Sequence, residues 1–542
     1  MKQLTTGTSD FPRLILEGEG KYVDKTALLY ELATPRTDAQ YFLSRPRRFG
    51  KSLMLSTLQA MFEGRRELFR GLAIDSLPWE GWDERRRHPV YRFTMADAVG
   101  ESYDGFMEEL TRLVRRLFLT AGLPEPQEGG PAGKFGDFIR AAAGASPTGK
   151  IVVLIDEYDE PVAKFLDDLP TLRRVRSALH DFYEKLKSNS EMIRFLMMSG
   201  VTKLTKLSVF SGLNHLTDLS MAPRFATLLG YTHDELDGAL RENVEEFGAR
   251  NGWDFATARA RLLEWYDGYR FSPRSEARVL NPVSLGKLFG RAGGELKSYW
   301  ETTGGSSLIF SRIKAAGKMP ADLEHVMADA MTLDVCDAET LPVESLLYQG
   351  GYLTIRDVVP APRPNTHGEG GLSETDAYVL APPNLEVRET LRRGYISQVL
   401  RLRVITFDTL VDRAKRQIRA GDLKGFLYES LFGLYASVPP DWRIRDEAEA
   451  KRYFQLFASL AGANPQPEVP SMLGYADAVI ETPAAVYVLE FKFDRTADEA
   501  IRQIRERGYA DKWAGGPRPV TLVGINFDPK RRNIDLPVIK AL

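Results

Sequence analysis

The residues of this sequence that could do chemistry gather first in the stretch RPRRFGKS, from Arg45 to Ser52. Gly50 would let the backbone approach a phosphate closely, Lys51 would reach the β- and γ-phosphates of a nucleotide, and the Ser52 hydroxyl would bind Mg²⁺. The usual pattern of a phosphate-binding loop starts with glycine, and Arg45 stands in that place. An ordinary solvated helix N-terminus is therefore the alternative interpretation.

An apolar run that ends in carboxylates provides the second signal. The segment IVVLIDEYDE, residues 151–160, lacks alternation, which is typical of a strand buried on both faces. We expect Asp156 to hold Mg²⁺ through water at the end of this strand and Glu157 to polarise the attacking water. A buried strand that merely exits into an acidic loop is the alternative. The next apolar segment, MIRFLMMSG, has Ser199 near its end. The Ser199 hydroxyl could contact the γ-phosphate or the attacking water, or it could form a hydrogen bond within its own turn.

Three further charged residues lie in the segment GYADAVIETPAAVYVLEFKF near the C-terminus. AVI and VYVLEF are rich in strand-forming residues, and TPAA between them is typical of a turn. A turn centred between Pro483 and Ala484 places Asp477 directly opposite Glu490, and Lys492 shares their face because side chains alternate along a strand. Two carboxylates and an ammonium on one face suit a Mg²⁺ site that activates water. The alternative is an exposed hairpin with a solvated charged face.

The phosphate loop and the acidic strand need a particular arrangement of elements around them. Strands alternate with helices over the first third of the chain, which predicts an α/β fold with a mostly parallel sheet and helices on both faces. The phosphate loop would join the first strand to the helix that follows it. The predicted strands are 39–43, 90–94, 151–155 and 192–200, and the predicted helices are 53–62, 103–119, 135–143 and 172–187.

The middle third of the chain, residues 225–420, is mostly helical by pattern. Thr232 and Glu235 have the spacing of a capping box at a helix start. Later helices lead to two extended segments, YQGGYLTIRDVV and AYVLAPP, which suggests a winged-helix-like arrangement. The tip between these segments is not basic, so we expect a structural role or a lid function and not a DNA-binding wing.

The composition is that of an ordinary globular protein, with 43% hydrophobic and 27% charged residues among 542. A net charge of −2 predicts no bulk attraction to nucleic acid, so any such contact must use local basic patches. The single cysteine, Cys336, excludes an internal disulfide framework and fits a reducing compartment. The N-terminal residues lack the apolar core of a secretory signal, and no apolar run approaches the roughly 18 residues of a membrane span. We therefore expect a cytoplasmic protein without a membrane partner.

Several motifs occur in a fixed order: YVDKT (22–26), RPRRFGKS, LIDEYD, VFSGLNHLTDLS, YDGYRF, NPVSL, YWETTG and APPNLEV. Together they resemble the bacterial AAA-ATPase-like proteins, which also carry arginine in place of the first glycine of the loop. The resemblance covers most of the chain and implies a P-loop domain that uses ATP and Mg²⁺. The predicted nucleotide-binding residues are Arg45, Arg48, Phe49, Gly50, Lys51, Ser52, Asp156 and Ser199.

The C-terminal hairpin resembles the PD-(D/E)xK nuclease pattern, as Asp477 followed by Glu490-x-Lys492. This resemblance implies that the two carboxylates bind metal and that the lysine positions or activates water. Ala476 stands where the motif name has proline. The same resemblance implies accessory residues, here Gln503 and Tyr509 on a following helix and an additional acidic residue, for which Glu449 and Glu468 are the candidates.

We therefore predict three domains, which are an AAA-ATPase-like P-loop domain (1–224), a helical lid with a winged-helix-like region (225–420) and a PD-(D/E)xK nuclease-like domain (421–542). ATP hydrolysis would be coupled to Mg²⁺-dependent cleavage of nucleic-acid phosphodiesters, with DNA as the expected substrate. Two alternatives stay open. One is a slow nucleotide-dependent switch whose C-terminal domain only recognises nucleic acid, and the other is an interaction scaffold with vestigial sites. A homo-oligomer is compatible with either.

Overall fold

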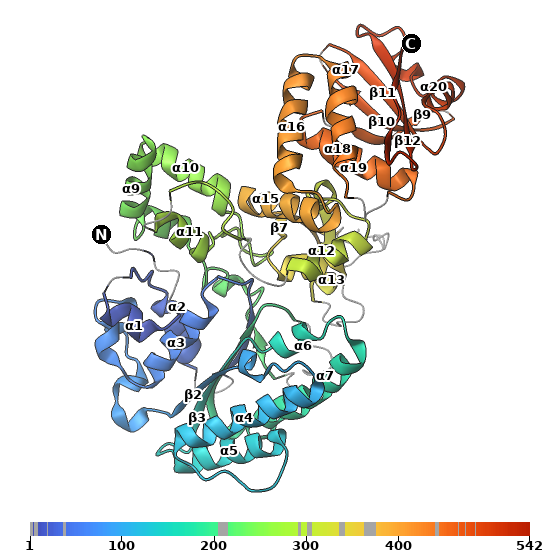
Figure 1. The fold of residues 1–542 in the computed structure, drawn as a ribbon. Helices are drawn as coiled ribbons and strands as arrows, with labels where there is room; N and C mark the ends of the chain where they lie inside the picture. The colour runs from blue at the N-terminus through green and yellow to red at the C-terminus, as the bar shows by residue number, and fades with distance from the viewer. Residues whose placement is uncertain are drawn as a thin grey trace, which may run out of the picture. The chain divides into compact units, whose positions relative to one another are not determined.

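The structure is a computed structural model, and its residues form two compact units (Figure 1). The first unit contains residues 1–303 and 323–390, and the second contains residues 304–322 and 391–542. These two units are defined by packing. The division of the sequence into three domains stays a prediction. The structure describes residues 4, 9–18, 20–35, 39–203, 215–290, 294–300, 306–334, 342–361, 376–439, 444–463, 465–471, 473–482 and 484–542.

A parallel sheet is the centre of the first unit. Among the described residues it has five strands in the order β2-β3-β4-β1-β5, and every pairing is parallel. All residues of β3 and β4 are buried, as the unalternating apolar runs predicted. The expected α/β architecture is confirmed. The strands are β1 (Gln40–Ser44), β2 (Val90–Thr94), β3 (Ile151–Asp156), β4 (Ile193–Gly200) and β5 (Thr217–Asp218).

Helices cover both faces of this sheet. On one face, Phe62 at the end of α3 packs against Phe195 of β4, with ring centroids 5.0 Å apart. On the other face, Phe138 of α5 packs against Tyr91 of β2 at 4.8 Å. Asp156 and Ser199 lie on the α3 face, because they continue the alternation of the side chains that contact α3. The helices of this region are α1 (Phe11–Leu16), α2 (Thr26–Ala33), α3 (Lys51–Phe62), α4 (Tyr103–Ala121), α5 (Pro131–Ala145), α6 (Glu160–Lys164) and α7 (Leu169–Ser188).

The middle of the chain is helical and carries a small antiparallel sheet. The predicted capping box is confirmed, because Thr232 and Glu235 exchange side-chain-to-backbone hydrogen bonds at the start of α8. The sheet has the order β6-β8-β7, and the expected tip between its last two strands (362–375) lies outside the described residues. The elements are α8 (His233–Asp237), α9 (Arg241–Asn251), α10 (Phe255–Tyr266), α11 (Pro282–Phe289), β6 (Val326–Asp329), α13 (Ala330–Asp334), α14 (Val343–Gln349), β7 (Thr354–Val359), β8 (Ala377–Ala381) and α15 (Leu385–Gly394).

The second unit is built on a mixed sheet with the order β13-β12-β11-β10-β9, and β14 also pairs with β12. Strands β11 and β12 are parallel, and the other pairs are antiparallel. Phe454 of α19 packs on Phe491 of β11 with centroids 5.0 Å apart. The strands are β9 (Gln466–Ser471), β10 (Gly474–Glu481), β11 (Val486–Phe493), β12 (Val520–Asp528), β13 (Asn533–Ile534) and β14 (Val538–Ala541). The helices are α12 (Ser306–Ala315), α16 (Val404–Arg419), α17 (Leu423–Gly425), α18 (Phe432–Ala436), α19 (Glu447–Leu460) and α20 (Ala497–Glu506).

Candidate nucleotide and metal sites

The phosphate loop runs from the end of β1 to the start of α3. Gly50 precedes the helix with a φ of 92°, a left-handed conformation that glycine adopts without steric cost. No side chain caps this end of α3. The first backbone N–H groups of the helix, around Lys51 and Ser52, are therefore available to an anion.

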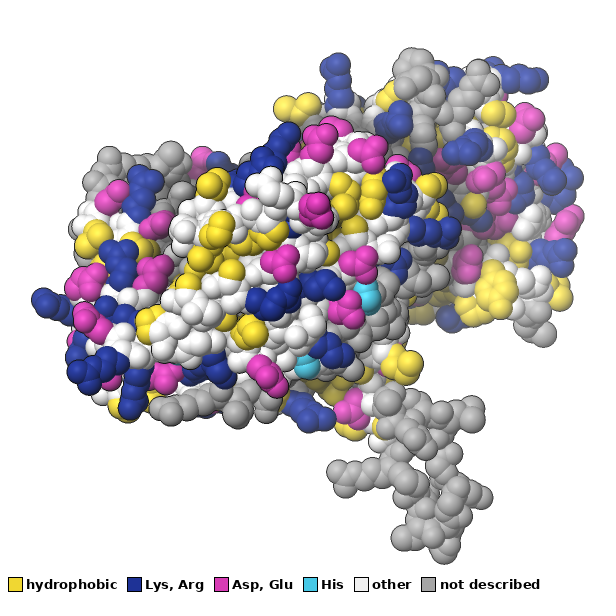
Figure 2. Space-filling model, turned by 90° about the horizontal axis from the view of Figure 1, so that it is seen from below, with side chains coloured by type: hydrophobic (Ala, Val, Ile, Leu, Met, Phe, Trp, Pro, Cys, Tyr) yellow, Lys and Arg dark blue, Asp and Glu magenta, His cyan; other side chains and the backbone are white. Residues whose placement is uncertain are grey.

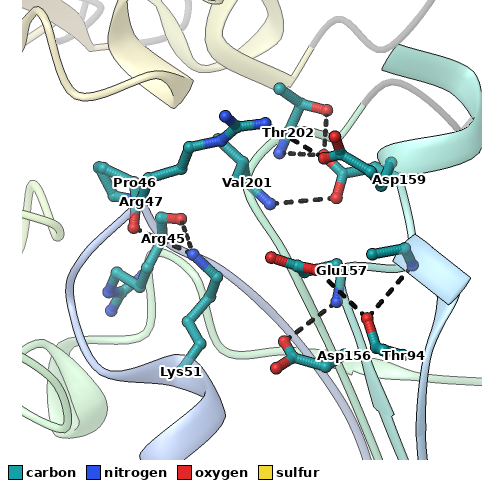
Figure 3. Close-up of polar contacts among 12 residues, drawn as sticks. Arg45, Pro46, Arg47, Lys51, Thr94, Asp156, Glu157, Asp159, Val201 and Thr202 are labelled. Carbon is teal, nitrogen blue, oxygen red and sulfur yellow. Dashed lines mark hydrogen bonds and ion pairs between the residues drawn. The ribbon is translucent and has the colours of Figure 1, made fainter. Parts of the chain in front are cut away.

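Lys51 points back into its own loop (Figure 3). Its Nζ donates hydrogen bonds to the carbonyl oxygens of Arg45 and Pro46, at 2.9 and 3.0 Å. Burial lowers the pKa of Lys51 to about 8, and the charge of Asp156 opposes this effect in part. A phosphate would be a stronger partner than two neutral carbonyls, because hydrogen bonds between charged groups are stronger than neutral ones.

The side chains of Arg45 and Phe49 are packed inside the fold. The buried guanidinium of Arg45 donates to the carbonyl oxygens of Ser44 and Ser220, at 2.9 and 2.6 Å, and lies 4.1 Å from the centroid of the Phe271 ring. Phe49 is 1% exposed and packs on the same Phe271 ring at 5.2 Å. Both side chains are used inside the fold, so the backbone of these residues is the part that lines the loop. Their predicted nucleotide contacts stay a prediction.

Arg48 connects the loop to residues much later in the chain. It has a φ of 71°, and its Nη1 donates to the carbonyl oxygen of Tyr299. The backbone N–H of Tyr299 in turn donates to Glu386 at 2.8 Å, and the Ser284 hydroxyl donates to the same carboxylate at 2.8 Å. Burial raises the pKa of Glu386 to about 7. A buried carboxyl group thus organises the NPVSL, YWETTG and APPNLEV motifs around the residue next to the loop.

The carboxyl end of β3 carries Asp156. Its Oδ1 accepts hydrogen bonds from the Ser199 hydroxyl at 2.6 Å and from the backbone N–H of Glu157 at 3.0 Å. Ser199 is fully buried, and its hydroxyl orients Asp156. Its contact with a γ-phosphate or with the attacking water stays a prediction. The bond to Asp156 differs from the alternative of a bond to its own turn.

Glu157 lies next to Asp156 with a φ of 49°. Its Oε2 accepts a hydrogen bond from the Thr94 hydroxyl at 3.2 Å (Figure 3). Burial, followed by the charge of Asp156, raises the pKa of Glu157, which makes its carboxylate a better base. The sequence reasoning missed Thr94, which is 63 residues away from Glu157. Its position at the end of a predicted strand was the only available signal.

A pocket with a volume of about 80 Å³ opens beside Gly50. Tyr22 and Tyr231 are among its walls. Lys25 of the YVDKT motif donates to Glu235 at 2.8 Å, which holds one wall in place. The lining residues are Leu14, Lys21, Tyr22, Val23, Lys25, Leu29, Phe49, Gly50, Leu53, Met54, Thr57, Leu228, Leu229, Gly230, Tyr231 and Pro282.

The second candidate site lies on the hairpin of β10 and β11. The observed register pairs Ala478 with Leu489. The next step of this register places Asp477 opposite Glu490, as the predicted turn required. Lys492, two residues further along β11, lies on the face of Glu490. The predicted register of the hairpin is confirmed.

Four side chains and the backbone N–H and C=O of Phe491 converge at this point of the hairpin. Asp477 accepts hydrogen bonds from Nζ of Lys451 on Oδ1, at 2.8 Å, and from the backbone N–H of Phe491 on Oδ2, at 2.7 Å. Lys492 donates to Oε1 of Glu490 at 2.9 Å and to the carbonyl oxygen of Phe491 at 2.6 Å. Two carboxylates and two ammonium groups therefore form one charged cluster.

Glu490 carries a carboxylate oxygen that a cation could bind. Its side chain is buried, and its Oε2 has no hydrogen-bond partner among the residues that the structure describes. Burial, followed by the charge of Asp477, raises the pKa of Glu490 to about 7. A buried, unsatisfied carboxylate oxygen beside a second carboxylate fits a divalent cation. No group of three or more His, Cys, Asp or Glu side chains gathers within the described ranges, so further ligands would be carbonyl or water oxygens.

Comparisons with known proteins match the two parts of the chain that carry these candidate sites. A family model described as "Predicted AAA-ATPase" matches residues 5–210, and a model of the PD-(D/E)XK nuclease superfamily matches residues 445–536. An "Uncharacterized protein in vnfD 5'region" of Azotobacter chroococcum mcd 1 is 32% identical over 557 aligned residues, which are 100% of this chain and 99% of that protein.

The chain belongs to the same family as this relative. It carries a predicted AAA-ATPase domain and a C-terminal PD-(D/E)XK nuclease superfamily domain. Among the helices that the structure describes, none has the length and hydropathy needed to cross a bilayer.

The acidic residues proposed to complete the PD-(D/E)XK site have different outcomes. Glu449 accepts the backbone N–H of Arg445 at 2.9 Å, at the N-terminus of α19. The residue of α19 that contacts Asp477 is Lys451. The sequence did not indicate this contact, because it does not show which side of the helix faces the sheet. The pairing of β9 with β10 places Glu468 opposite Asp477, and its side chain is exposed. Glu468 therefore stays a candidate for the additional acidic residue of the site.

The helix residues that the resemblance implied do meet in the structure. Gln503 of α20 donates through Nε2 to the hydroxyl of Tyr509 at 3.2 Å. Tyr509 is itself buried in the cluster of apolar side chains between α20 and the sheet. Any role of this pair beyond packing is a prediction.

Proposed function

We propose that the first unit binds and hydrolyses ATP. The phosphates would rest on the N–H groups that precede and open α3, and Lys51 would exchange its two carbonyl partners for phosphate oxygens. Ser52 and Asp156 would hold Mg²⁺, which supplies charge neutralisation on the phosphates when bound. Glu157, whose pKa is raised by burial, would orient and deprotonate the attacking water.

The pocket beside Gly50 supports a nucleotide over a simple phosphate. It shares Gly50 with the phosphate loop, so a ligand whose phosphates lie on the loop can extend its sugar and base into the pocket. The aromatic rings of Tyr22 and Tyr231 suit a planar base. We propose that these walls bind the nucleoside part of ATP.

We propose further that the second unit hydrolyses phosphodiester bonds in nucleic acid, with DNA as the expected substrate. Asp477 and Glu490 would hold a divalent cation, which supplies Lewis-acid activation of water when bound. Lys492 would stabilise the negative charge that develops on the phosphate. Three observations carry this proposal together: Asp477 and Glu490 face each other, Oε2 of Glu490 has no hydrogen-bond partner among the described residues, and Lys492 lies 2.9 Å from Oε1 of Glu490.

Nucleic acid would have to bind through local basic patches and not through the net charge. Figure 2 shows Lys and Arg side chains interspersed with Asp and Glu over the face that it displays. This mixed surface agrees with the net charge of −2. The single cysteine supports a cytoplasmic location within this proposal.

A nuclease assay tests the proposal. The full chain is incubated with supercoiled, linear and single-stranded DNA and with RNA, each with and without ATP and Mg²⁺. We expect Mg²⁺-dependent cleavage that is absent in Asp477→Asn and in Lys492→Met. Cleavage that persists in both variants would show that the hairpin is not the active site.

A slow nucleotide-dependent switch is the second candidate function. The contact between Thr94 and Glu157 favours it, because a hydroxyl that donates to the carboxylate competes with the attacking water for the same oxygen. Rapid ATP turnover by the purified chain, in the presence or absence of DNA, would exclude this candidate.

A further inference from the structure

Lys451 occupies the carboxylate that the proposed metal would need. Its Nζ lies 2.8 Å from Oδ1 of Asp477, and Oδ2 of the same carboxylate already accepts the Phe491 N–H. Asp477 therefore has a protein donor on each oxygen. Glu490, in contrast, has Lys492 on Oε1, and within the described part of the chain its Oε2 has no hydrogen-bond partner. A cation shared by the two carboxylates must compete with Lys451.

Of the two lysines, Lys451 is the one that a cation can displace more easily. Its side chain is 24% exposed, compared with 8% for Lys492, which is also fixed by the Phe491 carbonyl oxygen. Lys451 has a second acidic neighbour as well, because Glu447, one helical turn earlier on α19, lies 3.5 Å from its Nζ. When Lys451 moves away from Asp477, its charge can remain paired with Glu447.

We propose that Lys451 is a tethered counter-ion that holds Asp477 in the metal-free protein and is displaced toward Glu447 when a divalent cation binds. This inference rests on the proposed metal site. The ammonium neutralises the repulsion between Asp477 and Glu490 without metal, and it lowers the affinity of the site for metal by occupying one of its ligands. Metal therefore binds only when the concentration of divalent cation is high enough to displace Lys451 from Asp477.

The test is a titration of the full-length chain with Mn²⁺, followed by calorimetry and by the shift of the thermal unfolding midpoint. Lys451→Met keeps the methylene groups and removes the charge, and we expect it to bind Mn²⁺ about tenfold more tightly than the wild type. Lys451→Arg keeps a cation at the same place and should bind Mn²⁺ no more tightly than the wild type. Lys415→Met removes another helical lysine with an acidic partner three residues away and should leave the affinity unchanged.

The outcomes separate this inference from the function on which it rests. Equal or weaker Mn²⁺ binding by folded Lys451→Met, beside clear binding by the wild type, would overturn the counter-ion role and leave the metal site standing. If neither the wild type nor Lys451→Met binds Mn²⁺, the metal site itself fails. Binding that appears only in Lys451→Met supports the inference, and Asp477→Asn should abolish it in that background. Should Lys451→Met fail to fold, Lys451→Gln serves as the charge-free variant.

Discussion

Glu386 should make the stability of the first unit depend on pH near neutrality. Its carboxyl group is fully buried, and burial raises its pKa from the ordinary 4.5 to about 7. In the unfolded chain it releases its proton near pH 4.5, whereas the native state keeps the proton up to about pH 7. Between these values the native state binds more protons, so the free energy of unfolding falls as the pH rises.

The size of this effect follows from the two pKa values. Each pKa unit corresponds to about 1.4 kcal/mol, so the stabilisation present below pH 4.5 and lost above pH 7 is about 3 kcal/mol. The groups that face Glu386 and limit the effect are the Tyr299 N–H and the Ser284 hydroxyl, followed by the charges of Arg48 and Lys287. Loss of the Ser284 hydroxyl should therefore move the decline to higher pH.

The decisive variant is Glu386→Gln. The amide is neutral at every pH, can accept the Tyr299 N–H through Oε1 and can donate to the Ser284 hydroxyl through Nε2. We expect it to remove the decline between pH 5 and pH 8 and to match or exceed the wild type in stability at pH 8. Glu295→Gln is the matched control, because the Glu295 side chain is 82% exposed.

Urea unfolding of the full chain, followed by tryptophan fluorescence at each pH, measures this dependence. Five of the seven tryptophans lie in the first unit, so the signal reports mainly on that unit. Glu490 of the second unit also has its pKa raised to about 7 by burial and by Asp477, so Glu490→Gln must be measured beside it. A slope that persists unchanged in Glu386→Gln would refute the reasoning.

Three further predictions concern the proposed active sites. Lys51→Ala should abolish or greatly weaken ATP binding in a folded protein, and unaltered affinity in an equilibrium binding assay would contradict the phosphate-loop interpretation. Glu157→Gln should keep ATP binding and slow hydrolysis by about a hundredfold or more; an unchanged turnover rate would remove Glu157 from the mechanism. Asp477→Asn should lose the stabilisation by Mn²⁺ in thermal unfolding, while Lys492→Met should largely keep it and still lose cleavage; a normal Mn²⁺ shift in Asp477→Asn would exclude this carboxylate as a ligand.

The sequence allowed the sheet, the loop and the hairpin register to be predicted, because each depends on local rules. The buried strands β3 and β4 have unalternating apolar runs, and Gly50 marks the place where a strand–loop–helix turn needs a left-handed residue. The opposition of Asp477 and Glu490 follows from a short turn and from the alternation of side chains. Such features need only the residues of one segment.

The contacts that could not be predicted from the sequence depend on the direction of a side chain. Arg45 and Phe49 stand in a phosphate loop, yet their side chains pack on Phe271, which is more than two hundred residues later in the sequence. A motif indicates that the backbone forms a loop, but long-range packing decides which of its side chains face a ligand. Ser199 shows the same limit, since its hydroxyl is taken by Asp156 on the adjacent strand.

Both candidate sites hold their own lysine in a contact that a ligand must replace. Lys51 donates to two loop carbonyls, and Lys451 donates to Asp477. In each case the contact gives a hydrogen-bond partner to a charged group that would otherwise have none. Breaking this contact reduces the net free energy of ligand binding. The observed affinity for phosphate or metal is then lower than the intrinsic affinity, by the same logic that reduces binding to a partly populated state. Lys51 would exchange two carbonyl oxygens for a phosphate, and Lys451 would exchange Asp477 for Glu447, so each ammonium group keeps a partner when the ligand binds.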